Sequence, residues 1–353
     1  MGREHAAQVN DKHDAAVAAL ADIPADGWVA PFAGAEAGYR NRAKLVAGGS
    51  AERPTLGILG PDGQGVDLTG CGLYEPALAA SFEALAQFVT LADLVPYDVP
   101  ARRGELKYLL VTVSPDGELM VRFVLRSTEA LARIRKHLSW LHEALGSLVV
   151  ASVNIQPAHA AVLEGSREIV LTRAEALTMQ VGDVALRLAP RSFFQTNSEV
   201  AGALYRQAAT WADDLSPASV LDLYCGVGGF ALHLAAPGRQ VTGIEVSAAA
   251  VAGAQQAAGP GVVFHAGDAL ELAQAGDLPD LVVVNPPRRG LGVDLARWLD
   301  ESGVPHVLYS SCHLPSLVAD LAAMPGLRPV RARVLDMFPQ TTHAEVLVLA
   351  ERG

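Results

Sequence analysis

Short apolar runs alternate with amphipathic segments over the second half of the chain. Residues 199–213 carry apolar positions at helical spacing, and apolar stretches of strand length recur after them. Strands are expected to begin at Val220, Val241, Val262 and Leu281, and to cover residues 304–309, 330–335 and 345–349. Helices alternating with buried strands predict a doubly wound α/β sheet. The last two strands are too close for a parallel crossover, so we expect them to pair antiparallel.

The first half has a different pattern. Residues 5–20 are Ala-rich and helical in spacing, and residues 23–27 form a break. Strands are then expected at residues 44–47, 55–59, 65–68, 108–113, 119–125, 149–155 and 168–171, with helices at residues 75–94 and 131–145. We therefore expect an N-terminal helix at residues 1–27, a mixed α/β domain at 28–190 and the doubly wound domain at 191–353.

Charge is unevenly distributed along this chain of 353 residues, whose net charge is −11. An acidic protein has little unspecific affinity for nucleic acid. Residues 102–136, however, carry eight basic and four acidic side chains, and Arg40, Arg42 and Lys44 follow Tyr39. This pattern predicts a basic face for a selected polyanion, with a merely solvated surface as the alternative.

No apolar run approaches about 18 residues, and the N-terminal residues show no basic-then-apolar signal pattern. We therefore expect a cytoplasmic protein that does not enter a membrane.

A glycine loop follows the strand at Val220. Gly226, Gly228 and Ala231 fit the G-x-G-x-x-A form of the dinucleotide fingerprint, and Glu245 ends the next strand. Asp222 stands before the loop, where a carboxylate would repel a pyrophosphate. It would instead suit a cationic amino-acid group such as that of S-adenosylmethionine (SAM). The alternatives are a dinucleotide site and a tight turn without a ligand.

Further polar residues end the neighbouring strands. Ligands of doubly wound sheets bind outside the carboxyl ends of the strands, so Asp222, Glu245, Asp268 and Asn285 are expected to converge there. Asp268 is placed to accept from an exocyclic amine, and its alternative role is to cap the following helix.

Two prolines follow Asn285 and fix the backbone just beyond its strand. In enzymes that methylate exocyclic amines of bases, the next position is normally an aromatic residue that stacks on the flipped base. Here it is Arg288, which disfavours amine methylation and leaves carbon or another acceptor.

Cys312 lies just beyond the strand at 304–309 and faces the same cleft in this arrangement. Uracil C5 does not attack a methyl sulfonium unaided, whereas a thiolate that adds to C6 makes C5 nucleophilic. The alternative for a lone cysteine is a small buried hydrophobe. The C5 proton must later leave, and His343 and Glu345 are the candidate bases. The three cysteines match no zinc spacing, so no metal site is expected.

Together these segments resemble the RNA uracil-5-methyltransferases, particularly the bacterial 23S ribosomal-RNA enzymes. The matching segments are residues 192–197, 222–230, 243–245, 285–288, 309–312 and 337–345, with residues 38–44 and 71–76 in the first half. The resemblance implies a Rossmann-like SAM methyltransferase domain preceded by an RNA-binding domain. It implies a SAM site at Gln195, Tyr224, Glu245 and Asn285, to which the residue pattern adds Asp222, Gly226 and Asp268. It also implies that Cys312 is the nucleophile and Glu345 the base.

Two departures from the family stand out. Family members of this subtype hold a four-cysteine iron–sulfur cluster, whereas this chain has no cysteine before Cys71. A cluster needs four thiolates, so none is expected here, and residues 1–27 are interpreted as the remnant of a cluster-bearing segment. His313 and Leu314 replace the usual Asn-Pro after the cysteine, which puts the positioning of Cys312 in question.

The hypothesis is a monomeric SAM-dependent methyltransferase that acts on C5 of an unstacked uridine in a loop or bulge of 23S rRNA. We expect Arg40, Arg42, Lys44 and Arg288 to contact the RNA. The alternatives are a tRNA uracil-5-methyltransferase and a catalytically silent protein that binds SAM and RNA.

Overall fold

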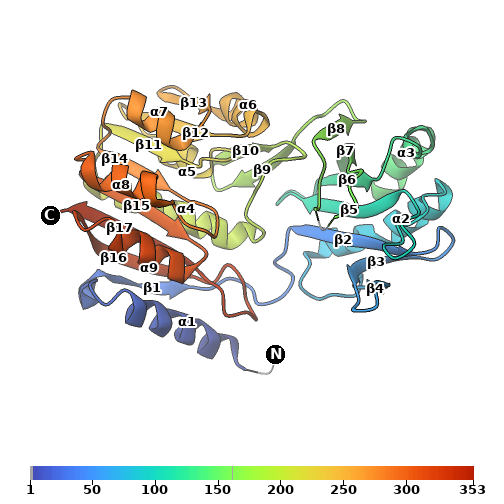
Figure 1. The fold of residues 1–353 in the computed structure, drawn as a ribbon, viewed down its shortest axis with the longest axis horizontal. Helices are drawn as coiled ribbons and strands as arrows, with labels where there is room; N and C mark the ends of the chain where they lie inside the picture. The colour runs from blue at the N-terminus through green and yellow to red at the C-terminus, as the bar shows by residue number, and fades with distance from the viewer. Residues whose placement is uncertain (1–2, 161) are drawn as a thin grey trace. The chain divides into compact units, whose positions relative to one another are not determined.

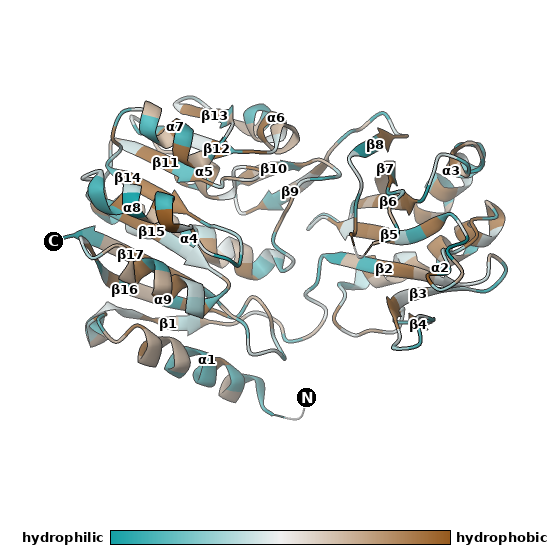
Figure 2. Ribbon diagram, in the orientation of Figure 1, coloured by the Kyte–Doolittle hydropathy of each residue, from teal (hydrophilic) through white to brown (hydrophobic). Residues whose placement is uncertain are grey.

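The computed structural model describes residues 3–160 and 162–353, which form two compact units (Figure 1). The large unit comprises Met1–Glu36, Val181–Leu188 and Ser192–Gly353. The small unit comprises Ala37–Gln180 and Ala189–Arg191. Figure 2 shows hydrophobic residues concentrated in the strands of both units, as expected for sheets covered by helices.

An eight-stranded sheet forms the large unit, in the order β1-β16-β17-β15-β14-β11-β12-β13. Its strands are β1 (Trp28–Phe32), β11 (Ser219–Leu223), β12 (Gln240–Glu245), β13 (Val262–Ala266), β14 (Leu281–Val284), β15 (His306–Ser311), β16 (Leu327–Leu335) and β17 (Glu345–Arg352). Strands β11 to β15 pair in parallel, and β17 lies antiparallel between β15 and β16. The predicted doubly wound sheet with an antiparallel last strand is confirmed.

Helices cover both faces of this sheet. They are α1 (His5–Ala19), α4 (Ser198–Leu215), α5 (Gly229–His233), α6 (Ala248–Ala257), α7 (Ala269–Ala275), α8 (Val293–Glu301) and α9 (Leu314–Ala322). Helices α1, α7, α8 and α9 bury apolar side chains in one core with the central strands, and α4 and α5 pack together elsewhere in the unit. All four residues of β14 are buried, which explains its unbroken apolar sequence.

The N-terminal boundary of the predicted domains differs from the structure. The sequence pattern places residues 28–36 in the mixed α/β domain, but β1 pairs in parallel with β16 and extends the large sheet. Residues 28–36 and 181–188 therefore belong to the large unit, together with α1. A short apolar strand has the same sequence pattern in either sheet, because its pairing partner is distant in the chain.

The small unit contains a seven-stranded sheet in the order β4-β3-β2-β5-β6-β7-β8. Its elements are β2 (Arg42–Gly49), β3 (Pro54–Leu59), β4 (Gly65–Asp67), β5 (Leu106–Val113), β6 (Leu119–Leu125), β7 (Leu148–Ile155), β8 (Arg167–Val170), α2 (Pro76–Leu91) and α3 (Leu131–Leu145). The predicted hairpin of β5 and β6 is confirmed, and β6 pairs in parallel with β7 after α3. Two further strands, β9 (Leu177–Val181) and β10 (Val184–Leu188), follow in the chain and form a two-stranded sheet, of which β10 belongs to the large unit.

Both helices of the small unit pack on the same core, which includes Ala43, Leu45, Leu109 and Val111. Side chains alternate across a strand, so the intervening residues of β2 and β5 point to the opposite, open face of the sheet. Among the described residues, no helix of either unit is long and apolar enough to cross a membrane.

Candidate active site

The glycine loop after β11 has an unusual backbone. Tyr224 adopts φ +63° and Gly226 φ +56°, in the region that most L-residues avoid. A side chain at Gly228 or Gly229 would overlap the ring of Phe264 or the hydroxyl of Tyr205, whereas a Cβ at Gly226 would meet nothing within 4 Å. The open side of the loop is therefore at Gly226, where a ligand can approach the backbone.

Asp222 lies beneath this loop and is fully buried. Its Oδ2 accepts from the Ala231 amide at 2.9 Å, while Oδ1 has no partner among the described residues. Burial, reinforced by Glu245, raises the pKa of Asp222 to about 8. Buried carboxylate oxygens normally have a donor, so the unpaired Oδ1 fits a site completed by a ligand or its water.

Glu245 ends β12 and joins the loop to that strand. Its Oε2 accepts from the Gly226 amide at 3.2 Å and its Oε1 from the Ser247 amide at 2.9 Å. Asp268 caps α7, because its Oδ1 accepts from the amides of Leu270 and Glu271. Burial is the main cause of the raised pKa of Tyr224, and the charge of Asp268 adds to it.

A chain of hydrogen bonds joins the neighbouring strands. The Asn285 amide donates to the Ser310 hydroxyl at 3.4 Å, and Ser310 donates to Glu345 Oε1 at 2.5 Å. Glu345 is 1% exposed, and burial raises its pKa to about 7 against the opposing effect of Ser310. The predicted cofactor residue and the predicted base are thus connected through Ser310, which the sequence did not single out.

Cys312 is partly exposed and lies beside Glu345 and Arg288. Burial raises the pKa of its thiol, and the charge of Glu345 adds to this. The nearby Arg288 guanidinium opposes the increase in pKa, because its positive charge favours the thiolate. Arg288, expected at the RNA, is therefore next to the nucleophile.

Cys312 also lines a hollow of about 310 Å³ with His313, Leu314, Lys12 and His343. His343 is exposed in the loop before β17, and only Glu345 of the two candidate bases is buried in the hydrogen-bond chain. His313 caps α9 by accepting from the Ser316 amide. The departure from the family after the cysteine thus supplies a helix cap.

Helix α1 contributes the buried residue Lys12 to the same part of the unit. Its ammonium donates to Asp336 Oδ1 at 2.6 Å and to the Phe338 carbonyl at 3.0 Å. His5 contacts the other oxygen of Asp336 at 2.7 Å. The helix therefore holds the start of the loop that leads to Glu345, a contact without a local sequence signal.

Gln195 is buried just before α4, and Asn197 caps this helix by accepting from the Val200 amide. In the small unit, Arg42 and Lys44 lie on the open face of β2. Arg42 donates to the Thr112 hydroxyl. Its pKa is lowered to about 10, mainly by burial and further by the positive charge of Arg122.

Arg40 stands just before β2 in the small unit and pairs with Tyr74 through an isolated bridge. Cys71 is a partly exposed free cysteine. Among the described residues, no group of three or more His, Cys, Asp or Glu side chains is arranged to hold a metal ion. The expected absence of an iron–sulfur cluster stays a prediction.

The fold and the glycine loop define a class I methyltransferase. Residues 220–300 match the family described as a methyltransferase domain. The fold is similar to that of Pyrococcus abyssi tRNA (uracil-54, C5)-methyltransferase, solved with S-adenosyl-L-homocysteine. The TM-score is 0.79 at 23% identity, over 98% of this chain and 83% of that one.

Relatives named 23S rRNA (uracil(747)-C(5))-methyltransferase RlmC are much more similar in sequence. Those of Escherichia coli (strain K12) and Shigella dysenteriae serotype 1 (strain Sd197) are each 48% identical over 336 residues, which covers 94% of this chain and 90% of the relative. The chain belongs to this family of 23S rRNA uracil-C5-methyltransferases.

Proposed function

We propose that this protein transfers a methyl group from SAM to C5 of a uridine in 23S rRNA, the position numbered 747 in the name of its relatives. The observation that carries the proposal is the grouping around one partly exposed sulfur: the Arg288 guanidinium and buried Glu345 both lie close enough to the Cys312 thiol to act on its pKa, in opposite directions. A nucleophile, a cation that stabilises its thiolate and a carboxylate base are the groups that this reaction needs.

The reaction begins at Cys312. The guanidinium of Arg288 favours the thiolate, which adds to C6 of the uracil ring and makes C5 an enolate carbon. SAM, when bound, supplies the electrophilic methyl group that C5 takes up. Glu345 then removes the proton from C5, the C5–C6 double bond re-forms, and the bond from C6 to sulfur breaks. The products are 5-methyluridine, S-adenosyl-L-homocysteine and the free Cys312 thiolate, with the C5 proton left on Glu345.

Glu345 is suited to this role by its surroundings. Its raised pKa of about 7 makes it a stronger base than an exposed carboxylate, while a substantial fraction remains ionised near neutral pH. The Ser310 hydroxyl stabilises the ionised form. His343, the second candidate, lies exposed at the rim of the hollow.

The SAM site is proposed at the carboxyl ends of β11, β12, β13 and β14. Its residues would be Gln195, Asp222, Tyr224, Gly226, Glu245, Asp268 and Asn285. The open space at Gly226 and the unpaired Oδ1 of Asp222 support this assignment.

The small unit is proposed to bind the RNA through Arg40, Arg42 and Lys44. A base must leave its stack before a thiolate can reach C6, so we propose an unstacked uridine in a loop or bulge as the substrate. A cytoplasmic, monomeric enzyme is part of the same proposal.

The proposal is tested with a 23S rRNA fragment that carries 5-fluorouridine at the target position. Fluorine does not leave as a proton does, so the protein is expected to stay covalently attached after methyl transfer, as a SAM-dependent band on a denaturing gel. Cys312→Ser should give no band, whereas Cys71→Ser, at a partly exposed free cysteine outside the large unit, is the matched control. SAM binding without any adduct would instead support a silent SAM- and RNA-binding protein, and an adduct with tRNA alone a tRNA enzyme.

A further inference from the structure

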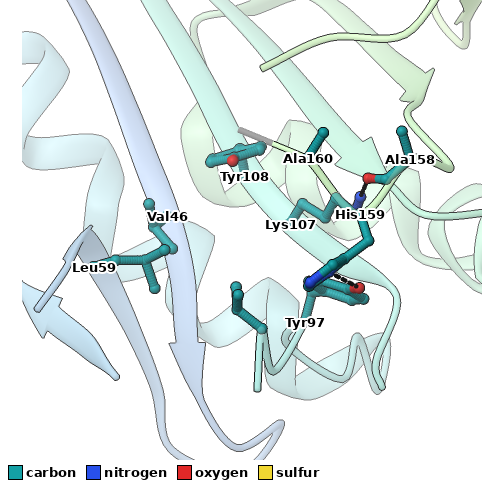
Figure 3. A pocket seen from close by; sticks show the side chains of 9 residues that line it. Val46, Leu59, Tyr97, Lys107, Tyr108, Ala158, His159 and Ala160 are labelled. Atoms are coloured by element: carbon teal, nitrogen blue, oxygen red, sulfur yellow. Dashed lines mark hydrogen bonds between the residues drawn. The ribbon is translucent and has the colours of Figure 1, made fainter. Parts of the chain in front are cut away.

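The small unit contains a pocket of about 320 Å³ (Figure 3). Its lining includes Tyr97, Val99, Lys107, Tyr108, Ala158 and His159. Its volume lies at the low end of the range of about 300–1,000 Å³ typical of ligand sites. The pocket lies wholly within the small unit, and nothing proposed above accounts for it.

Two tyrosines provide stacking surfaces in this pocket. The Tyr97 hydroxyl is hydrogen-bonded to His159 Nδ1 at 3.0 Å, which fixes the orientation of its ring (Figure 3). Tyr108 is half-buried on the open face of β5, the face that also carries Arg42 and Lys44 of β2. Proteins that bind single-stranded RNA use aromatic rings in such positions to stack unpaired bases.

Lys107 is the most unusual residue of the pocket. The pairing of β5 with β6 shifts register between Leu106 and Tyr108, so Lys107 lies at a β-bulge. Bulges redirect side chains and are frequent beside functional sites. Its ammonium, on a residue only 6% exposed, donates to Gln156 and to the Ala158 carbonyl at 2.7 Å, and lies 4.7 Å from the centre of the Tyr97 ring.

The charge of Lys107 has no carboxylate partner among the described residues. The charges that act on it are those of Arg126 and Glu105, and the Glu105 carboxylate is already bonded to Arg126 and Ser127. An ammonium has three N–H donors, of which the described protein groups accept two. A buried cation with a remaining donor favours a ligand that brings a strong acceptor, such as the keto oxygen of a base.

The surroundings favour RNA as the source of this ligand. The loop that carries Tyr97 and Val99 continues into the exposed residues Arg102 and Arg103. Basic side chains on a loop that also lines an aromatic pocket suit the phosphates on either side of an inserted base.

We propose that this pocket binds a second unstacked base of the RNA, distinct from the methylated uridine, which stacks on Tyr97 and Tyr108 while its keto oxygen accepts from Lys107. The inference rests on the proposed function, because it takes rRNA as the ligand. Its role is specificity: a nucleotide recognised in the small unit fixes the register of the strand that delivers the target.

The test combines RNA and protein substitutions. A single abasic site is moved through the unpaired positions of the 23S rRNA fragment, with the target uridine kept, and the dissociation constant is measured by fluorescence anisotropy at fixed salt. One position other than the target is expected to weaken binding about ten-fold or more, as loss of one stacked base does. Uniformly small effects at every non-target position would overturn the proposal.

Tyr108→Leu and Lys107→Met are each expected to weaken binding of the intact RNA, and to abolish the further effect of that abasic site. Tyr108→Leu, at a half-buried position, covers the case in which Lys107→Met does not fold. Lys136→Met, which removes a charge from the exposed side of α3, should weaken all RNAs equally. An abasic effect of full size in Tyr108→Leu would refute the assignment of the pocket.

The 5-fluorouridine adduct separates this proposal from the proposed function. The pocket variants should still form the adduct, at a higher RNA concentration for half-maximal yield. The catalytic proposal alone would be refuted if the wild-type protein forms no adduct, while one abasic position still weakens its RNA binding and the pocket variants abolish that effect. Saturable binding of UMP or GMP that the RNA fragment does not compete away would instead indicate a site for free nucleotides, and would overturn the RNA assignment.

Discussion

The hydrogen bond from Ser310 to Glu345 offers a direct test of the proposed base. The Ser310 hydroxyl is buried and donates to Oε1 of a carboxylate that is itself 1% exposed. It is the interaction that opposes the effect of burial on the pKa of Glu345, which lies at about 7. Ser310→Ala removes this donor and leaves the backbone pairing of β15 and β17 in place, so the pKa of Glu345 should increase.

The size of the effect follows from the energy of the bond. A hydrogen bond to a charged group contributes about 1.5–3 kcal/mol, and one pKa unit corresponds to about 1.36 kcal/mol. The acid limb of the pH profile should therefore move up by about one to two pH units. Because Glu345 acts in its ionised form, proton removal at pH 7 should slow by about 5- to 50-fold and recover as the pH is raised.

The assay measures the removal of the C5 proton separately from the formation and methylation of the adduct. In single turnovers with methyl-labelled SAM and unmodified RNA, quenched samples are resolved on denaturing gels into free RNA and methylated protein–RNA adduct between pH 6 and 9. Ser310→Ala should accumulate adduct at pH 7 and release it at pH 9. Ser302→Ala, which removes a hydroxyl at the end of α8, is the control. An unshifted acid limb in Ser310→Ala would refute the assignment of Glu345 as the base.

Three further substitutions test other parts of the site. Glu345→Gln should trap the methylated adduct at every pH, because an amide does not accept the C5 proton; prompt product release on the gel would contradict this. Lys12→Met should lower the free energy of unfolding of the large unit by about 3–5 kcal/mol in denaturant titrations, because it leaves the Asp336 carboxylate buried without its ammonium. The double variant Lys12→Met/Asp336→Leu should lose less free energy of unfolding than Lys12→Met alone. An equal loss in the two variants would argue against the ion pair. Gly226→Ala should weaken SAM binding in calorimetry by more than ten-fold, whereas Gly238→Ala, at another positive φ with open space, should leave it unchanged.

Local sequence patterns were sufficient for most elements and for the main chemical groups. The hairpin of β5 and β6 follows from two alternating strands around a tight turn, and the antiparallel β17 follows from a connection too short for a crossover. Cys312 and Glu345 could be singled out because each lies beside the end of a strand, in segments that resemble a known family. The structure brings these two residues together.

What the sequence left open are pairings between distant residues. Strand β1 carries no signal for its partner β16, and Ser310 resembles any buried hydroxyl until β15 and β17 are paired. Lys12 is an ordinary helical lysine in sequence, yet its ammonium lies buried beside Asp336, 324 residues away. The sequence by itself determined the elements, their order and the kind of chemistry, because periodicity and turn residues act locally. Only the tertiary structure decided which polar groups meet, because burial and hydrogen bonding depend on the neighbours that folding brings together.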